Sequence, residues 1–187
     1  MGMASGRRFW PLDPRADEVH VEDIALALSN LCRFGGRCQR FYSVAQHCLH
    51  VAELAASVLP SAGPHGLLHD AAEAYLGDII RPLKNWVLIQ QPAGRRISTE
   101  PFFMAEKRVL DAIYERLGLA EPTVAERQAV IHADELALAV EARDLMGDPR
   151  WPGLPVVSLP PLLPMDGPSA RMAFTEKLNR LLPGTMT

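Results

Sequence analysis

Imidazole and carboxylate groups, which bind divalent metals, occur among residues whose helical spacing puts them on otherwise apolar faces. Each such set of residues is called a line below. The first such line steps by three and four residues, the spacing of one helix face, and consists of Val44, His47, Val51, Leu54 and Val58. The neighbouring line is polar, so His50 is expected to face water; its other members are Ser43, Gln46, Glu53 and Ser57. Considered alone, His47 is more simply a buried histidine with one hydrogen bond.

Residues 123–146 repeat this pattern with acidic side chains. Asp134 and Glu141 share a line of helical spacing with Ile131, Leu138 and Leu145. A carboxylate on such a line loses its hydration when the line is buried, and this loss destabilises the fold unless a nearby cation compensates the charge. The compensating group is either an arginine, such as Arg37 or Arg143, or a metal ion.

A third group lies in residues 66–78. His69, Asp70 and Glu73 are spaced so that all three share one side of a helix, among the small side chains of Ala71 and Ala72. Two acids and a histidine on one face repel one another or stay neutral unless positive charge compensates them. A divalent metal supplies that charge.

A single metal ion would explain why polar side chains occupy all three of these otherwise apolar helix faces. His47, His69, Asp70 and Asp134 make a set of two imidazoles and two carboxylates from three helices. Such a set suits a divalent transition metal (Mn, Fe, Co, Ni or Zn), with Mg as an alternative, and leaves positions for water and a phosphate oxygen.

The order His47, then His69-Asp70, then Asp134 resembles the H…HD…D signature of the HD-superfamily metal-dependent phosphohydrolases. Residues 69–84 are similar to the H-D-x-x-E-x-x-x-G-D-x-x-x-P-x-K string of the bacterial 5′-deoxynucleotidase branch. The short phage dATP triphosphohydrolases belong to the same broad group. The resemblance covers about residues 22–145, and more loosely the arm rich in Trp and Pro and the last helix.

The resemblance implies a role for each matching residue. His47, His69, Asp70 and Asp134 become the metal ligands. Glu73 orients or deprotonates the attacking water, Asp78 helps to hold substrate or water, and Lys84 meets phosphate oxygens. Arg33-Phe34 corresponds to an Arg-aromatic pair that contacts phosphate and base, although Arg37 or Arg40 is an alternative for the arginine.

These roles describe a metal-dependent phosphohydrolase of (deoxy)nucleoside 5′-phosphates, in which an activated water attacks the phosphorus next to the 5′ oxygen. Two substrates fit: a dNMP, cleaved to nucleoside and phosphate, or a dNTP such as dATP, cleaved to nucleoside and triphosphate. The alternative from another class is a non-catalytic helical module that senses a nucleotide or a metal. The presence of Glu73, Asp78 and Lys84 favours the enzyme, because a binding module needs no general base.

Helical periodicity predicts an all-α bundle of about six to eight helices that would position these groups. The main helices are expected at Val21–Arg33, Ser43–Leu59, Pro64–Leu76, Glu100–Leu117, Thr123–Met146 and 170–182. Residues 79–99 are expected to form a short helix or loop, because Pro82, Pro92 and Gly94 interrupt them, and no strand-turn-strand pattern is evident. Seven prolines in residues 149–168 predict an extended arm before the closing helix.

Composition sets the class of protein. A chain of 187 residues with 48% hydrophobic and 22% charged residues fits one globular domain spanning 1–187, with its core at about 22–145. A net charge of −3 argues against a nucleic-acid polymer or a membrane surface as partner. Without a signal peptide or a spacing typical of disulfides among its three cysteines, the chain is expected to be cytoplasmic. A small nucleotide is the expected substrate, and a homo-oligomer the expected assembly.

Overall fold

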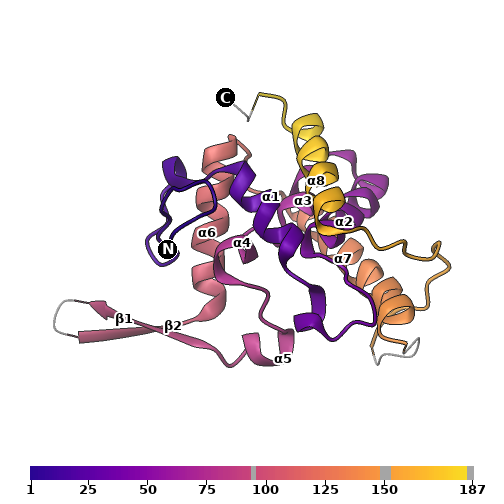
Figure 1. Ribbon diagram of the computed structural model, residues 1–187, viewed down its shortest axis with the longest axis horizontal. Helices are drawn as coiled ribbons and strands as arrows, with labels where there is room; N and C mark the ends of the chain where they lie inside the picture. The colour runs from indigo at the N-terminus through magenta and orange to yellow at the C-terminus, as the bar shows by residue number, and fades with distance from the viewer. Residues whose placement is uncertain (94–95, 148–152, 185–187) are drawn as a thin grey trace.

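The computed structural model describes residues 1–93, 96–147 and 153–184. These residues form an all-α bundle with one small hairpin, so the predicted fold class is confirmed (Figure 1). The helices are α1 (Val21–Asn30), α2 (Val44–Val58), α3 (Gly63–Leu68), α4 (Glu73–Leu76), α5 (Arg81–Lys84), α6 (Phe102–Leu117), α7 (Val124–Leu145) and α8 (Gly167–Leu181).

Helix α2 is the centre of the bundle, because it packs against α1, α3, α7 and α8. Ser43 caps its first turn by accepting a hydrogen bond from the backbone N–H of Gln46. Gly66 lets α3 approach closely: a Cβ at this position would lie only 2.9 Å from the Cα of Ala52. This contact places His69, which directly follows α3, close to His47 of α2.

The predicted helix at Pro64–Leu76 is interrupted between α3 and α4. Residues 69–72 form tighter turns instead, in which the N–H of Ala71 donates to the carbonyl of Leu68 at 2.9 Å and that of Glu73 donates to Asp70 at 3.0 Å. His69 takes part in the break, because its ring contacts the Gly66 carbonyl at 2.8 Å, an acceptor in the last turns of α3. His69 and Asp70 therefore lie in a turn, rather than on a regular helix face.

The expectation of a short helix or loop without strands at residues 79–99 is only partly right. Helix α5 is present, but Leu88–Ala93 (β1) and Arg96–Pro101 (β2) pair as an antiparallel hairpin that projects from the helices (Figure 1). Pro92, which seemed to exclude a strand, is tolerated because each strand of a two-stranded ribbon has a free edge.

The C-terminal arm lies against α2 and α7. Residues 153–166 have no regular secondary structure, whereas residues 149–152 of the predicted arm lie outside the described residues. The side chain of Gln46 bonds the carbonyl of Leu163 and the N–H of Met165, both at 2.8 Å. Gln46 is therefore buried beneath the arm, not exposed as its polar line predicted.

Several helix limits also differ from the expectation. Helix α6 begins at Phe102 instead of Glu100, because Glu100 and Pro101 belong to β2. Helix α1 ends at Asn30 instead of Arg33, because Cys32 pairs with Ser43 in an antiparallel bridge. Helix α8 begins at Gly167, earlier than predicted, after Asp166 has capped it. None of the described helices combines the length and apolar character needed to cross a bilayer.

Candidate metal centre

His47 is fully buried on α2, as its position on the apolar line predicted. Its Nδ1 lies 2.6 Å from Oε1 of Glu141, which α7 brings against α2. The other oxygen of Glu141 accepts a hydrogen bond from Nη2 of Arg33 at 3.2 Å. The expected arginine partner is thus Arg33, and not Arg37 or Arg143.

In the triad of His47, Glu141 and Arg33, the negative charge of Glu141 is balanced by its two basic partners. Burial raises the pKa of Glu141, but the charges of His47 and Arg33 outweigh it and keep that pKa below its ordinary value. Burial and Arg33 lower the pKa of His47, whereas the contacts with Glu141 and Asp134 raise it above its ordinary value. Glu141 therefore fixes the orientation of the His47 ring and leaves Nε2 facing the opposite way.

Three nitrogen and oxygen atoms gather at that free side of His47. Nε2 of His47 lies 3.2 Å from Nε2 of His69 and 3.5 Å from Oδ2 of Asp70, and the last two atoms are 3.2 Å apart. Ligand atoms about 2.1 Å from one ion lie about 3.0–3.4 Å from each other. The three side chains could therefore hold a metal ion with little rearrangement.

Asp134 approaches this cluster from α7. Its Oδ1 lies 3.3 Å from Nε2 of His47, while its Oδ2 contacts Nη2 of Arg81 at 3.5 Å. Asp134, the fourth member of the predicted set, therefore lies beside His47 and also forms an ion pair with the exposed Arg81.

The carboxylates of this cluster favour the protonated forms of the two imidazoles. Despite burial, Asp70 raises the pKa of His69 well above its ordinary value, and His69 in turn holds the pKa of Asp70 far below its own. Burial raises the pKa of Asp134, but the hydrogen bond and charge of His47 outweigh it and lower that pKa to about 2. A metal that binds here must displace protons from the imidazoles.

The cluster opens into a cavity of about 740 Å³. Every residue to which the resemblance assigns a substrate or catalytic role lines it: Arg33, Phe34, Glu73, Asp78 and Lys84. Asp70 and Asp134 line it as well, so these two carboxylates face the same space. His47 and His69 are not among the lining residues.

Glu73 is the unusual group on this wall. Its side chain is almost fully buried, and its Oε2 has no hydrogen-bond partner among the described residues. Burial, followed by the charges of Asp70 and Asp78, raises its pKa to about 9 despite the nearby Lys84. A buried, protonated carboxyl beside metal-binding groups is typical of acid–base sites.

Lys84 is held between two carboxylates. Its Nζ lies 3.5 Å from Oε1 of Glu73 and 2.7 Å from Oε1 of Glu106, a residue of α6. Sequence reasoning missed Glu106, because nothing in the spacing of α6 links it to residues 69–84. The pairing of Lys84 with Glu106 becomes visible only once α5 and α6 are placed in space.

Arg33 reaches the cluster from the turn before α2. Besides Glu141, its guanidinium contacts Oδ2 of Asp70 at 3.5 Å. Phe34 follows in a left-handed conformation with φ of 57°, which is uncommon for a residue with a side chain, and its ring lies beneath the guanidinium. Arg37 bonds the carbonyl of Phe34 and is exposed, so Arg33 is the arginine that faces the donors.

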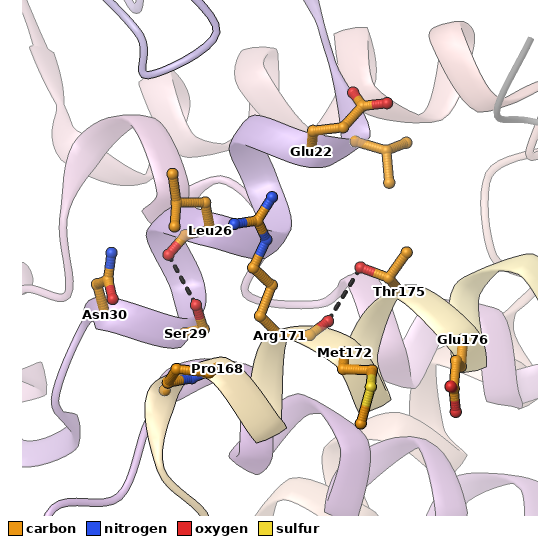
Figure 2. Close-up of a pocket in the computed structure, with 11 residues that line it drawn as sticks. Glu22, Leu26, Ser29, Asn30, Pro168, Arg171, Met172, Thr175 and Glu176 are labelled. Atoms are coloured by element: carbon orange, nitrogen blue, oxygen red, sulfur yellow. Dashed lines mark hydrogen bonds between the residues drawn. The ribbon is translucent and has the colours of Figure 1, made fainter.

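A second cavity, of about 510 Å³, lies between α1 and α8 (Figure 2). Arg171 crosses it from α8 toward α1, and Glu22 and Glu176 stand at its borders. None of the donor residues lines it. The candidate metal-binding carboxylates and the predicted catalytic residues therefore line the first cavity and not the second.

Comparison with known proteins gives relatives that cover most of the chain. The uncharacterized protein YfdR of Escherichia coli is 35% identical over 182 residues, which is 95% of this chain and 92% of YfdR. The chain belongs to the YfdR family. An uncharacterized protein of Rhodobacter capsulatus is 34% identical over 152 residues, 78% of this chain and 72% of its own length.

No protein-family model matches the chain. The names of the YfdR relatives state no activity, so the chemistry of this YfdR-family member has to be inferred from its site.

Proposed function

We propose that this chain is an HD-superfamily phosphohydrolase that uses a divalent metal to cleave (deoxy)nucleoside 5′-phosphates. One observation carries the proposal. Asp70 of the His47, His69 and Asp70 cluster lines the same cavity as Glu73 and Arg33, and each of these two has a buried polar atom, Oε2 and Nε, without a partner among the described residues. Unpaired buried polar atoms are rare, and on a cavity wall they point to a polar ligand.

The metal would be held by His47, His69, Asp70 and Asp134. Two imidazoles and two carboxylates favour Mn, Fe, Co, Ni or Zn, with Mg as the alternative. When bound, a divalent cation neutralises charge on phosphoryl oxygens and lowers the pKa of a water molecule from about 15.7 to about 7.

Glu73 is the proposed general base. Burial and the charges of Asp70 and Asp78 raise its pKa to about 9 despite Lys84 and Arg33, so it keeps its proton at neutral pH. A metal cation held beside Asp70 would lower this pKa, so Glu73 would ionise and would then serve as the acceptor for a proton of the attacking water. Its contribution would be about 10²–10⁴-fold.

Lys84 and Arg33 supply fixed positive charge for the phosphoryl oxygens. Both line the cavity, and both are already positioned by carboxylates, Glu106 for Lys84 and Glu141 for Arg33. Donors that are oriented in advance stabilise developing negative charge without reorganising during the reaction. Asp78, which also lines the cavity, would hold a substrate hydroxyl or a water.

The cavity has the size of a small-molecule site, since such sites are typically about 300–1,000 Å³. Phe34, Leu138 and Leu154 give it an apolar side for a base or sugar. Arg37 and Arg81 at the same wall could meet further phosphates, so both a dNMP and a dNTP are kept as substrates.

The experiment combines purified protein with Mn²⁺, Co²⁺, Zn²⁺, Ni²⁺, Fe²⁺ or Mg²⁺ and each dNMP or dNTP, and separates the products by anion exchange. Phosphate from dNMPs identifies a 5′-nucleotidase, and inorganic triphosphate from a dNTP identifies a triphosphohydrolase. Asp111→Asn on the exposed part of α6 should match the unmodified protein, whereas Asp70→Asn should be inactive. No turnover with any pair would refute the enzyme and favour a sensing module.

The proposal includes the setting of the reaction: a cytoplasmic enzyme that forms a homo-oligomer and acts on a free nucleotide. Support for an oligomer comes from exposed apolar side chains in and around the hairpin: Leu83, Trp86, Leu88, Ile97 and Phe103. An apolar patch of this kind is typical of interfaces. Sedimentation as a monomer at the enzyme's working concentration would refute the oligomer.

A further inference from the structure

Two of the three cysteines flank the turn that carries Arg33 and Phe34. Sγ of Cys32 lies 3.5 Å from Sγ of Cys38, and both side chains are partly exposed. Cys48 is buried in the core. The pair therefore sits at the edge of the candidate site, and the metal-binding groups do not use it.

The fold of the turn brings the two thiols together. Phe34, Gly35 and Gly36 all have positive φ, between 57° and 77°, so the chain reverses sharply after Arg33. Both sides of this reversal are fixed: the N–H of Arg33 donates to Tyr42, and that of Gln39 donates to Leu145. Cys38 also lies close to the carbonyl of Arg33, with Sγ at 3.8 Å.

A metal site at this pair has no support. Among the described residues, the one cluster of three or more histidine, cysteine or acidic side chains that could hold a metal is that of His47, His69 and Asp70. Two adjacent, partly exposed thiols without further donors are instead suited to oxidation.

We propose that Cys32 and Cys38 form a reversible disulfide upon reaction with hydrogen peroxide or an organic hydroperoxide, and that this bond displaces Arg33 from Glu141 and Asp70. One thiolate attacks the peroxide, giving a sulfenic acid and water or an alcohol. The second thiol then displaces hydroxide from that sulfur, so that the disulfide forms and a second water leaves. A dithiol reductant reverses the reaction by thiol–disulfide exchange.

Displacement of Arg33 follows from the distances. A disulfide requires the two sulfurs at about 2.05 Å, so they must approach each other by about 1.5 Å. Arg33 is adjacent to Cys32, and its contacts with Glu141 and Asp70 are already 3.2 and 3.5 Å long. Movement of the turn on that scale breaks them. Burial, together with the neighbouring Cys32 thiol, raises the pKa of Cys38, so oxidation is expected to accelerate as pH rises.

The first experiment follows the thiols of the full chain treated with hydrogen peroxide. We expect an intact mass lower by two hydrogens, a peptide joining Cys32 to Cys38, and a single thiol, Cys48, that maleimide labels after denaturation. Cys48→Ala should still form the bond, whereas Cys32→Ser and Cys38→Ser should not. Maleimide labelling of all three cysteines after peroxide, or a bond to Cys48 or to another chain, would overturn the proposal.

The second experiment reads the position of Arg33 without any assay of turnover. Phenylglyoxal modifies accessible arginines, and mass spectrometry locates the adducts. We expect Arg33 to react several-fold faster in the oxidised protein and to return to its original rate after dithiothreitol. An unchanged rate would overturn the displacement of Arg33.

The consequence for phosphate hydrolysis rests on the proposed function, where oxidation should lower turnover reversibly. If the nucleotide assays fail, the thiol and arginine measurements still decide this inference by themselves.

Discussion

The candidate site has two halves that are built differently. His47, Asp134 and Glu141 stand on α2 and α7, two long helices that pack directly on each other, and His47 and Glu141 are fully buried. Arg33, Asp78 and Lys84 stand on turns and on a helix of four residues, and each of them is partly exposed. The first half belongs to the core, and the second half is attached to it through side-chain contacts.

This difference separates binding of the metal from binding of the substrate. Side chains on packed helices, such as those of His47 and Glu141, keep their geometry, but substituting them also disturbs the core. Groups on turns adjust more easily, so their substitution should affect turnover with little effect on the fold. The following predictions test whether the two halves respond in these separate ways.

The largest effect is expected for Asp70→Asn. Oδ2 of Asp70 contacts both histidines, and an amide is a poor substitute for a carboxylate as metal ligand. Metal content and turnover should both be lost while the helical circular dichroism persists. Metal analysis after dialysis checks this, with Asp111→Asn as control. Full metal retention in Asp70→Asn would contradict the cluster as a metal site.

Glu73→Gln should separate turnover from metal binding. The amide keeps the shape of the side chain but cannot accept a proton from water, so turnover should fall about 10²–10⁴-fold. Metal content should be unchanged. Glu135→Gln is the matched control, because Glu135 lines the same cavity but is exposed. A similar loss of turnover in both variants would show that Glu73 has no special role.

Glu141→Gln tests the buried half through stability. The substitution leaves the Arg33 side chain, which is only 12% exposed, without its fully buried carboxylate partner, and breaking such a pair costs about 3–5 kcal/mol. Urea unfolding should register this loss, whereas Glu115→Gln on the exposed side of α6 should lose little. A loss below about 1 kcal/mol for Glu141→Gln would mean that the triad does not support the core.

Glu106→Gln tests the attached half. Without this carboxylate Lys84 keeps only the 3.5 Å contact with Glu73, so it should be less well oriented toward phosphate. We expect KM to rise by about tenfold, equivalent to about 1.4 kcal/mol, with metal content and unfolding unchanged. A loss of metal instead would place Glu106 in the support of the first half.

The two halves also differed in how far the sequence predicted them. Helical periodicity correctly predicted that His47 is buried, and that Asp134 and Glu141 lie on one side of α7, because a helix repeats every 3.6 residues. It failed for Ile131, which lies on the same line but is 54% exposed, since α7 is covered along only part of its length.

Contacts between distant segments were beyond such reasoning. Arg33 and Glu141 are 108 residues apart, and their pairing depends on how the turn before α2 meets α7. The polar line of α2 predicted an exposed Gln46, yet the arm covers it. The hairpin was missed because Pro92 and Gly94 are also typical of loops.

The smallest effect is expected for His50→Ala, which lies one helical turn after His47. His50 is partly buried rather than fully exposed as its polar line predicted, and burial lowers its pKa below the ordinary value. A histidine whose pKa is lower in the folded state contributes stability above its unfolded pKa of about 6.5, and this contribution is lost as pH falls through the folded value. His50→Ala should therefore keep metal and turnover. Between about pH 7.5 and about pH 5.5, its melting temperature should fall less than that of the unmodified protein. Loss of metal in this variant would contradict the assignment of His47 as the ligand from α2.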